Sequence, residues 1–472
     1  MSNDLKLLIG GELVDGDDTM EVIDPAMGTP FMSVPRASAR QAKQAIAAAK
    51  AAQPGWAALS IDERRNCLSV FADAIHENAE AITRMLVREQ GKPLTEAAAE
   101  IAATEAFIRY FTSLDLPVEV LQDDEVRRVE LHRKPLGVVC AIMPWNFPVL
   151  LAAFKFPAAL LVGNSFILKP APTTPVTSLM LGELARDVFP PGVFNVVTDL
   201  NDLGPTLTDH PDVAKISFTG SAATGKKVMA AAASTLKRVS LELGGNDASI
   251  VLDDVDIATA APKIFAGAFM NAGQVCIAIK RVYAHSSIYD ALCDELAKLA
   301  GEAIVGDGLQ QGTQIGPLQN AAQYEKAKSF LESAHREGRV IAGGEVAEGE
   351  GYFIRPTIVR DIEDGTMLVD QEQFAPILPI IKFDDVDDAL RHANNSEYGL
   401  GGSVWSGDRD RAYAVARQID SGMVWVNQHL DFGPHIPFGG AKQSGMGMEL
   451  SIEGLHEFSQ TAVINISKES VG

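Results

Sequence analysis

Cysteine is scarce in this chain: only four of its 472 residues are cysteine, and no two of them form a C-x-x-C pair. A disulfide framework needs many paired cysteines in a short chain, and a structural zinc site needs closely spaced cysteine or histidine ligands. The sequence therefore predicts neither a disulfide scaffold nor a metal site. It favours a reducing compartment, and we expect the protein in the cytoplasm.

Positive charge is also in deficit, because 40 lysine and arginine residues stand against 62 aspartate and glutamate residues, for a formal net charge of −22. Nucleic-acid phosphates are bound by clustered lysine and arginine, so this balance argues against a nucleic-acid partner. A solvated acidic surface that aids solubility is the simpler interpretation. It does not exclude a locally basic phosphate site.

Long uninterrupted apolar runs are absent as well. The first six residues contain no basic stretch followed by an apolar one, so no signal peptide is expected. The most hydrophobic segment, 147–168, is interrupted by two prolines, a lysine and an asparagine. It predicts a buried helix and strand rather than a membrane span, and no membrane partner is expected.

What the chain does have is the alternation of strands and helices that is typical of an α/β protein. Its length, with 47% apolar and 22% charged residues, is typical of a soluble globular protein of two or three domains. Short apolar strands alternate with helical segments from Pro135 onward, and a second such series runs from Ala248 to about Gly440. This order predicts parallel sheets in the doubly wound arrangement, which binds nucleotides at its carboxyl edge. The predicted strands are 137–143, 165–169, 194–198, 214–219 and 239–243 in the first series and 249–252, 281–284, 377–382 and 402–405 in the second.

The first 135 residues show a different pattern. Helices are predicted over 37–50, 61–90 and 94–114, where apolar residues recur every three or four residues. Asp62 is the expected N-cap of the second helix. Residues 117–135 alternate between apolar and polar, which predicts a two-stranded ribbon. An exposed ribbon has unpaired edges, and another subunit is a natural cover for them.

One cysteine differs from the other three. Cys67, Cys140 and Cys293 lie in apolar helix or strand patterns and are predicted to be core residues. Cys276 ends the segment Asn271-Ala-Gly-Gln-Val-Cys, whose glycine allows a tight turn and whose backbone N–H groups could face a developing oxyanion. Taken alone, the segment favours a buried structural cysteine, and a nucleophile is the alternative.

Seven short motifs follow one another along the chain, and the full set in this order identifies a protein family far more specifically than any one motif does. In order, they are Pro144-Trp-Asn-Phe-Pro148, Leu168-Lys-Pro170, Phe218-Thr-Gly-Ser221, Leu241-Glu-Leu-Gly-Gly245, Gly273-Gln-Val-Cys276, Glu372-Gln-Phe-Ala-Pro376 and Pro437-Phe-Gly-Gly-Ala-Lys442. In these motifs the sequence resembles the aldehyde dehydrogenase superfamily over nearly its whole length.

The resemblance implies a fold and an assembly. A Rossmann-like cofactor domain would comprise residues 1–115 and 136–244, and an α/β catalytic domain residues 245–443. Residues 116–135 and 458–472 would form a small β oligomerisation ribbon, the first segment pairing with a C-terminal strand near 461–466. A homodimer or homotetramer is expected, with the ribbon crossing between subunits.

The resemblance also assigns the chemistry, oxidation of an aldehyde to the acid. Cys276 would attack the carbonyl, because a tetrahedral adduct must form before hydride can leave. The Asn146 amide and the Cys276 N–H would face the oxyanion, where losing one donor typically costs ~10²–10³ in rate. Glu242 would be the general base that hydrolyses the thioester. Singly, Glu242 could be a strand-end carboxylate and Asn146 a turn residue, while Glu449 could relay protons or lie on the surface.

Residues 220–225, Gly-Ser-Ala-Ala-Thr-Gly, suit a pyrophosphate at a helix N-terminus, although they depart from the G-x-G-x-x-G fingerprint. By resemblance, Lys169 would reach the adenosine ribose and Glu372 the nicotinamide ribose. Pro172 stands where NAD-preferring relatives often carry glutamate, yet it offers no donor to a 2′-phosphate, so NAD is expected and NADP is the alternative. The expected cofactor set is Met143, Trp145, Lys169, Gly204, Gly220, Ser221, Gly225, Glu372 and Phe374.

The small-molecule aldehyde is the least determined feature. The resemblance implies a funnel lined by Leu151, Phe154, Met270, Phe432 and Phe438. Relatives that act on succinate semialdehyde carry an arginine where Phe154 stands, so an apolar or aromatic aldehyde is expected. A coenzyme A-acylating dehydrogenase, which tends to lack the base at Glu242, and a non-catalytic member of the fold are the alternatives.

Overall fold

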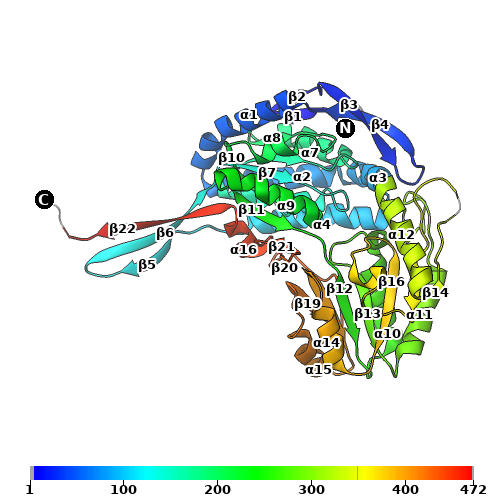
Figure 1. Cartoon of the computed structure of the whole chain (residues 1–472). Helices are drawn as coiled ribbons and strands as arrows, with labels where there is room; N and C mark the ends of the chain where they lie inside the picture. Colours follow the sequence, from blue (N-terminus) through cyan, green and yellow to red (C-terminus); the bar gives the residue numbers. More distant parts are fainter. Residues whose placement is uncertain (1–4, 348, 470–472) are drawn as a thin grey trace.

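A computed structural model describes residues 5–347 and 349–469. Residues 1–4 of the expected leaderless N-terminus and 470–472 of the expected ribbon segment lie outside this part of the chain. The described chain forms two sheet-containing lobes and a projecting arm (Figure 1).

The first sheet has eight strands in the order β2-β1-β9-β8-β7-β10-β11-β21. The strands from β9 to β11 are parallel, and β1, β2 and β21 add antiparallel edges. Every residue of β7 and β8 is buried, as expected when helices cover both faces of a parallel sheet. The strands are β1 (Leu7–Ile9), β2 (Glu12–Val14), β7 (Val138–Ile142), β8 (Ser165–Lys169), β9 (Phe194–Val196), β10 (Val213–Thr219), β11 (Arg238–Glu242) and β21 (Gly445–Met446).

Helices from both ends of the chain surround this sheet. They are α1 (Ala39–Ala58), α2 (Ile61–Glu77), α3 (Ala79–Gln90), α4 (Leu94–Thr112), α5 (Leu150–Ala153), α6 (Phe156–Val162), α7 (Val176–Arg186), α8 (Gly204–Thr208), α9 (Ala222–Ala232) and α16 (Ser451–His456), with a 3₁₀ turn η1 (Ala233–Thr235). A separate hairpin, β3 (Asp18–Asp24) and β4 (Thr29–Arg36), lies beside α3.

The second sheet has seven strands in the order β14-β15-β16-β13-β12-β18-β19, all parallel except β14. The predicted α/β class with parallel sheets is confirmed. The strands are β12 (Asp247–Val251), β13 (Ile279–His285), β14 (Arg339–Ala342), β15 (Thr357–Arg360), β16 (Ile377–Phe383), β18 (Gly401–Trp405) and β19 (Met423–Val426). The associated helices are α10 (Ile257–Phe269), η2 (Met270–Gly273), α11 (Tyr289–Glu302), α12 (Ala321–Glu337), α13 (Met367–Asp370), α14 (Val386–Asn394) and α15 (Arg409–Ala416), and β17 (Tyr398–Gly399) pairs with β20 (Ala441–Lys442).

Each sheet has its own hydrophobic core, and the segment around Cys276 lies between the two. Val275, Ile277 and Ala278 pack in the core of the first sheet, whereas Ala272 and Ile279 pack in the core of the second. Cys276 thus lies where the two cores meet, a kind of position in which ligand sites commonly form.

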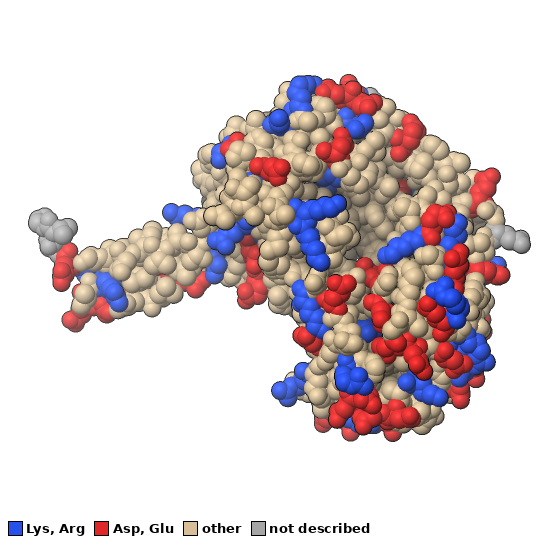
Figure 2. All heavy atoms as spheres, in the orientation of Figure 1, with Lys and Arg blue, Asp and Glu red and all other residues tan. Residues whose placement is uncertain are grey.

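The arm is a three-stranded antiparallel ribbon of β5 (Glu119–Asp123), β6 (Arg127–Pro135) and β22 (Ser459–Ser467), with β6 in the centre. It extends away from both lobes (Figure 1). Figure 2 shows few charged side chains along the middle of the arm, while acidic residues gather on the lobe of the second sheet. Apolar side chains on both edge strands face solvent, including Leu121 at 56% and Val463 at 58% exposure.

The helical region differs from prediction in three details. The first helix, α1, continues to Ala58 instead of ending at residue 50. The stretch 61–90 is two helices, because the chain breaks at Asn78 (φ −107°, ψ 10°). The N-cap of α2 is Ser60 rather than Asp62, and Ser60 forms a reciprocal capping box with Glu63. No helix of the described residues is long and apolar enough to cross a membrane.

Candidate active site

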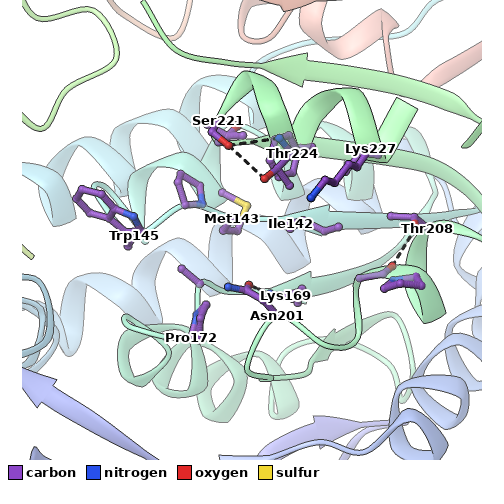
Figure 3. Close-up of a pocket in the computed structure, with 18 of the residues that line it drawn as sticks. Ile142, Met143, Trp145, Lys169, Pro172, Asn201, Thr208, Ser221, Thr224 and Lys227 are labelled. Carbon is purple, nitrogen blue, oxygen red and sulfur yellow. Dashed lines mark hydrogen bonds between the residues drawn. The ribbon is translucent and has the colours of Figure 1, made fainter. Parts of the chain in front are cut away.

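A cavity of about 690 Å³, here called the sheet-edge cavity, opens at the carboxyl ends of β7, β8 and β10. Helices α8 and α9 form its walls, and Figure 3 shows Ser221 and Thr224 at the start of α9 above Met143 and Lys169. The Ser221 side chain caps α9 by accepting from the Thr224 N–H. A parallel sheet edge with a capped helix N-terminus fits a dinucleotide and its pyrophosphate.

Most of the predicted cofactor residues line this cavity. Met143, Trp145, Lys169, Gly204, Gly220 and Ser221 do so, together with Pro172. Gly225 does not; it is buried in the first turn of α9, where a Cβ would come within 2.7 Å of the Leu243 side chain. Its missing side chain lets the helix pack on the sheet.

Lys169 has a buried partner. Its Nζ lies 2.6 Å from Asp199 Oδ1, also donates to the Pro170 carbonyl at 3.1 Å, and is 3.4 Å from Asn201 Oδ1. The Asp199 carboxylate is fixed in turn by the Leu203 N–H at 2.9 Å. The ammonium on the cavity wall is therefore already paired with a negative charge.

A second cavity of about 220 Å³, here called the apolar cavity, lies on the other side of Cys276. Phe154 stacks on Phe107 with ring centroids 5.2 Å apart and meets Phe432 and Phe438 edge-on. All five residues of the predicted funnel line it, namely Leu151, Phe154, Met270, Phe432 and Phe438. Among the described residues, its lining includes the carboxyl-bearing Glu96 and Glu100 but no lysine, arginine or histidine.

A third cavity of about 210 Å³, here called the junction cavity, shares lining residues with each of the other two. Trp145, Gly220 and Ser221 line both it and the sheet-edge cavity, whereas Asn146 and Cys276 line both it and the apolar cavity. The predicted residues Glu372 and Phe374 also line the junction cavity. Cys276 therefore lies where an apolar ligand and a dinucleotide would meet.

The backbone before Cys276 is strained. Asn271, Ala272 and Gly273 all have positive φ, at 50°, 54° and 73°, and a Cβ on Gly273 would lie 2.5 Å from the Ala375 carbonyl oxygen. The turn is held by the Asn271 N–H, which donates to the Glu96 carboxylate at 3.0 Å, and by the Gln274 amide, which donates to the Asn271 carbonyl at 2.9 Å. Such strain persists only where the surroundings fix it, and it clusters at functional sites.

Asn146 is oriented by the same turn. The side-chain Nδ2 of Asn146 donates to the Gln274 backbone carbonyl at 3.0 Å. The backbone carbonyl of Asn146 accepts a hydrogen bond from Lys92 Nζ at 2.8 Å. An amide nitrogen carries two N–H groups, so one fixes the side chain and the other is available to a ligand oxygen in the cavity.

Glu242 ends β11 but lines none of the three cavities. It is buried, and neither carboxylate oxygen has a hydrogen-bond partner among the described residues. Burial, and then the negative charge of Glu449, raise its pKa well above the usual range, while Lys155 opposes the shift. Glu449 forms a buried ion pair with Lys155 and accepts from the Ser217 hydroxyl at 3.2 Å.

The Cys276 thiol is held in its neutral form. Burial is the main cause that raises its pKa to about 12, followed by the negative charges of Glu242, Asp247 and Glu372. Lys280 is the cation that opposes this shift. Since the thiolate is the nucleophile, any group that favours it bears directly on reactivity.

A model of the aldehyde dehydrogenase family matches residues 13–464. The chain belongs to the aldehyde dehydrogenase family. It is an NAD(P)-dependent enzyme that oxidises aldehydes, and the resemblance seen in the seven motifs is confirmed.

The enzyme is similar to relatives over its full length. Aldehyde dehydrogenase LUC3 of Fusarium sp is 40% identical, with 98% of both chains covered. The succinate-semialdehyde dehydrogenase [NADP(+)] of Escherichia coli K12 is 37% identical over 96% of this chain and 95% of its own. The NAD+ complex structure of aldehyde dehydrogenase from Bacillus cereus superimposes with a TM-score of 0.97 at 33% identity, covering 99% of this chain and 97% of that one.

The charged residues at the site that were not predicted from the sequence include Glu96, Asp199 and Lys280. Glu96 stands in an ordinary alanine-rich helix, and Lys280 at the start of an ordinary strand. Asp199 follows β9 at the carboxyl edge of the sheet, a position where a functional role could have been suspected. For the other two, only the tertiary contacts reveal the connection to Cys276.

Proposed function

We propose that this aldehyde dehydrogenase oxidises an uncharged, apolar or aromatic aldehyde to the free acid through a covalent adduct on Cys276, with NAD as the preferred cofactor. The observation that carries the proposal is the position of Cys276 between the apolar cavity and the junction cavity. An aldehyde enters from one side, and the dinucleotide supplies the hydride acceptor on the other.

In this mechanism the Cys276 sulfur attacks the aldehyde carbonyl and gives a thiohemiacetal. The free N–H of the Asn146 amide and the Cys276 backbone N–H face the resulting oxyanion. Loss of hydride leaves a thioester on the sulfur. Glu242 turns from its buried position toward the thioester and takes a proton from the attacking water, and the acid is released. Lys155 favours the ionised form of Glu242, whereas Glu449, its partner in the buried ion pair, opposes it.

The charge lining the apolar cavity sets the substrate class. Glu100 is paired with Lys92 at 2.5 Å, whereas among the described residues the Glu96 carboxylate accepts a hydrogen bond only from the Asn271 N–H. A carboxylated aldehyde would bring a like charge into this cavity without a cation to receive it. We therefore expect higher kcat/KM for hexanal or benzaldehyde than for succinate semialdehyde.

The substitution Glu96→Gln tests this reading of the cavity. It should raise kcat/KM for succinate semialdehyde relative to hexanal by about tenfold, the effect of one pKa unit of charge interaction. Burial raises the Glu96 pKa to about 7, so the wild-type discrimination should grow as pH rises through that value. Glu105→Gln, on the same helix but outside the cavity, is the control. A wild type that prefers succinate semialdehyde would refute the substrate proposal.

The pairing of Lys169 with Asp199 supports a preference for NAD over NADP. Because the Lys169 ammonium is already paired with Asp199, this lysine brings no net positive charge to a 2′-phosphate. Lys227 and Asp209, which also line the cavity, carry opposite charges. We expect higher kcat/KM for NAD than for NADP, and Asp199→Asn should raise the NADP-to-NAD ratio by roughly tenfold. Asp202→Asn, in a neighbouring exposed ion pair, should leave the ratio unchanged. Preference of the wild type for NADP would overturn the argument.

We also propose a homodimer or homotetramer that forms through the ribbon. Among the described residues, β5 and β22 each pair only with β6, so their outer edges are unpaired and carry exposed apolar side chains. Light scattering coupled to size exclusion should show at least a dimer, and Val463→Asp should weaken it. Leu236→Asp, at a 90% exposed site elsewhere, should not. A wild type that is only monomeric would contradict this assembly.

A cytoplasmic location is part of the proposal because the nucleophile must stay a free thiol. Cys67, Cys140, Cys276 and Cys293 are all unpaired in the structure, and thiols persist in reducing compartments. Cell fractionation should recover the activity with cytosolic markers. Recovery in a secreted fraction would count against it.

A further inference from the structure

Lys280 is a buried lysine whose side chain contacts both the nucleophile segment and a residue of the junction cavity. It is the second residue of β13, lies four residues after Cys276, and is 1% exposed. Its Nζ donates to the Gly273 carbonyl at 2.6 Å and lies 4.9 Å from the centre of the Phe374 ring. The lysine thus contacts the strained turn before Cys276 and a residue of the junction cavity.

Acidic groups face this ammonium from several elements. Asp247 on β12, Glu372 after α13 and the Cys276 thiol all favour its charged form. Asp247 accepts from the Gly401 N–H at 3.0 Å, and Glu372 accepts from the Gly245 N–H at 3.0 Å, so both carboxyl groups are fixed in place. Burial works in the opposite direction and lowers the pKa of Lys280 to about 8.

Two other basic side chains face the same region, and neither replaces Lys280. Lys326 on α12 is exposed and donates to the Glu372 backbone carbonyl at 2.9 Å. His429, after β19, is buried beside the Ile277 carbonyl, and burial lowers its pKa to about 4. His429 is therefore neutral at physiological pH, and Lys280 is the buried cation next to the thiol.

We propose that Lys280 is a positioning residue for the nucleophile: its ammonium holds the Gly273 carbonyl, and with it the left-handed turn before Cys276, and supplies the positive charge that favours the Cys276 thiolate. The inference rests on the proposed role of Cys276 as the nucleophile. A lysine that only satisfied a buried carbonyl would keep the turn in place but would not change the ionisation of the thiol.

The test is the rate at which iodoacetamide alkylates Cys276, followed by peptide mass spectrometry from about pH 6 to about pH 10. In this reaction the thiolate sulfur displaces iodide, so the rate reports the thiolate fraction and requires neither cofactor nor turnover. Lys280→Gln keeps an amide that can donate to Gly273 but removes the charge, while Lys280→Met removes both. Lys298→Gln, on an exposed lysine of α11, is the control.

We expect Lys280→Gln to alkylate about tenfold more slowly than wild type near pH 7, the effect of one pKa unit on the thiolate fraction. Since Lys280 is charged below about pH 8 and neutral above it, the difference should shrink toward pH 10. A ratio that is the same at every pH, or no difference at all, would overturn the proposal. Either result could occur with the mechanism at Cys276 intact.

The dependence of the wild-type alkylation rate on pH tests the same proposal without any variant. Its logarithmic rate should rise with a slope below one through about pH 8, because the thiolate loses its cation while hydroxide increases. A slope of one throughout this range would contradict the role of Lys280 even if both variants failed to fold. Loss of turnover in Cys276→Ser, measured separately, tests the proposed function and not this inference.

Discussion

Cys276→Ser should lose at least about 10³-fold of its aldehyde-dependent reduction of NAD, the scale of loss when a covalent nucleophile is removed. A serine hydroxyl in this half-buried, carboxylate-rich setting would be a far weaker nucleophile than a thiolate. The sheet-edge cavity does not include Cys276, so binding of the dinucleotide should survive the substitution. Steady-state absorbance of the reduced cofactor measures the first effect, and quenching of tryptophan fluorescence by NAD measures the second.

The matched control is Cys67→Ser, at a half-buried cysteine on α2 that packs against the core of the first sheet. It should retain turnover close to that of the wild type. Equal losses in both variants would point to damaged folding, and full activity of Cys276→Ser would mean that another group forms the covalent adduct or that none forms.

Glu242→Gln should have the second-largest effect, because it removes the proposed base but leaves the nucleophile. General-base catalysis typically contributes ~10²–10⁴ in rate, so steady-state turnover should fall by that order. The first turnover should still produce a burst of reduced cofactor, since hydride transfer precedes hydrolysis. Stopped-flow absorbance separates the burst from the steady state.

The pH dependence follows from the state of Glu242. Burial and then the charge of Glu449 raise its pKa well above the usual range, and only its ionised form can accept a proton. Hydrolysis by the wild type should therefore become faster as pH rises through this pKa, and Glu242→Gln should lose that rise. If coenzyme A, rather than hydroxide, accelerated the wild-type steady state, the acyl-transferring alternative would replace the hydrolytic one.

Local patterns in the sequence predict the sheets well because buried parallel strands are short, continuous apolar runs. The runs at 165–169 and 214–219 lie in β8 and β10, buried throughout or nearly so. The helix boundaries are less predictable: the periodic pattern continues across Asn78, and only the backbone there shows that α2 and α3 are separate. Strands β15 and β19 were not predicted.

The residues of the candidate site also fall into a predictable group and an unpredictable group. Motif residues such as Trp145, Glu372 and Phe438 could be assigned to cavities from resemblance. The charges that surround them could not, because they depend on pairs far apart in the sequence. Glu96 reaches Asn271 across 175 positions, and Lys155 pairs with Glu449 across 294. No local pattern encodes such contacts, although they decide which charges remain uncompensated near Cys276.

The central claim is that a thioester forms on Cys276, and mass spectrometry of the quenched and digested protein tests it most directly. Glu242→Gln would be mixed with NAD and hexanal, quenched in acid within the first turnovers, and digested to locate any adduct. The account predicts a hexanoyl group on the peptide that carries Cys276, absent without NAD and absent in the double variant with Cys276→Ser. An active enzyme that carries no acyl group, or carries it on another residue, would contradict the account.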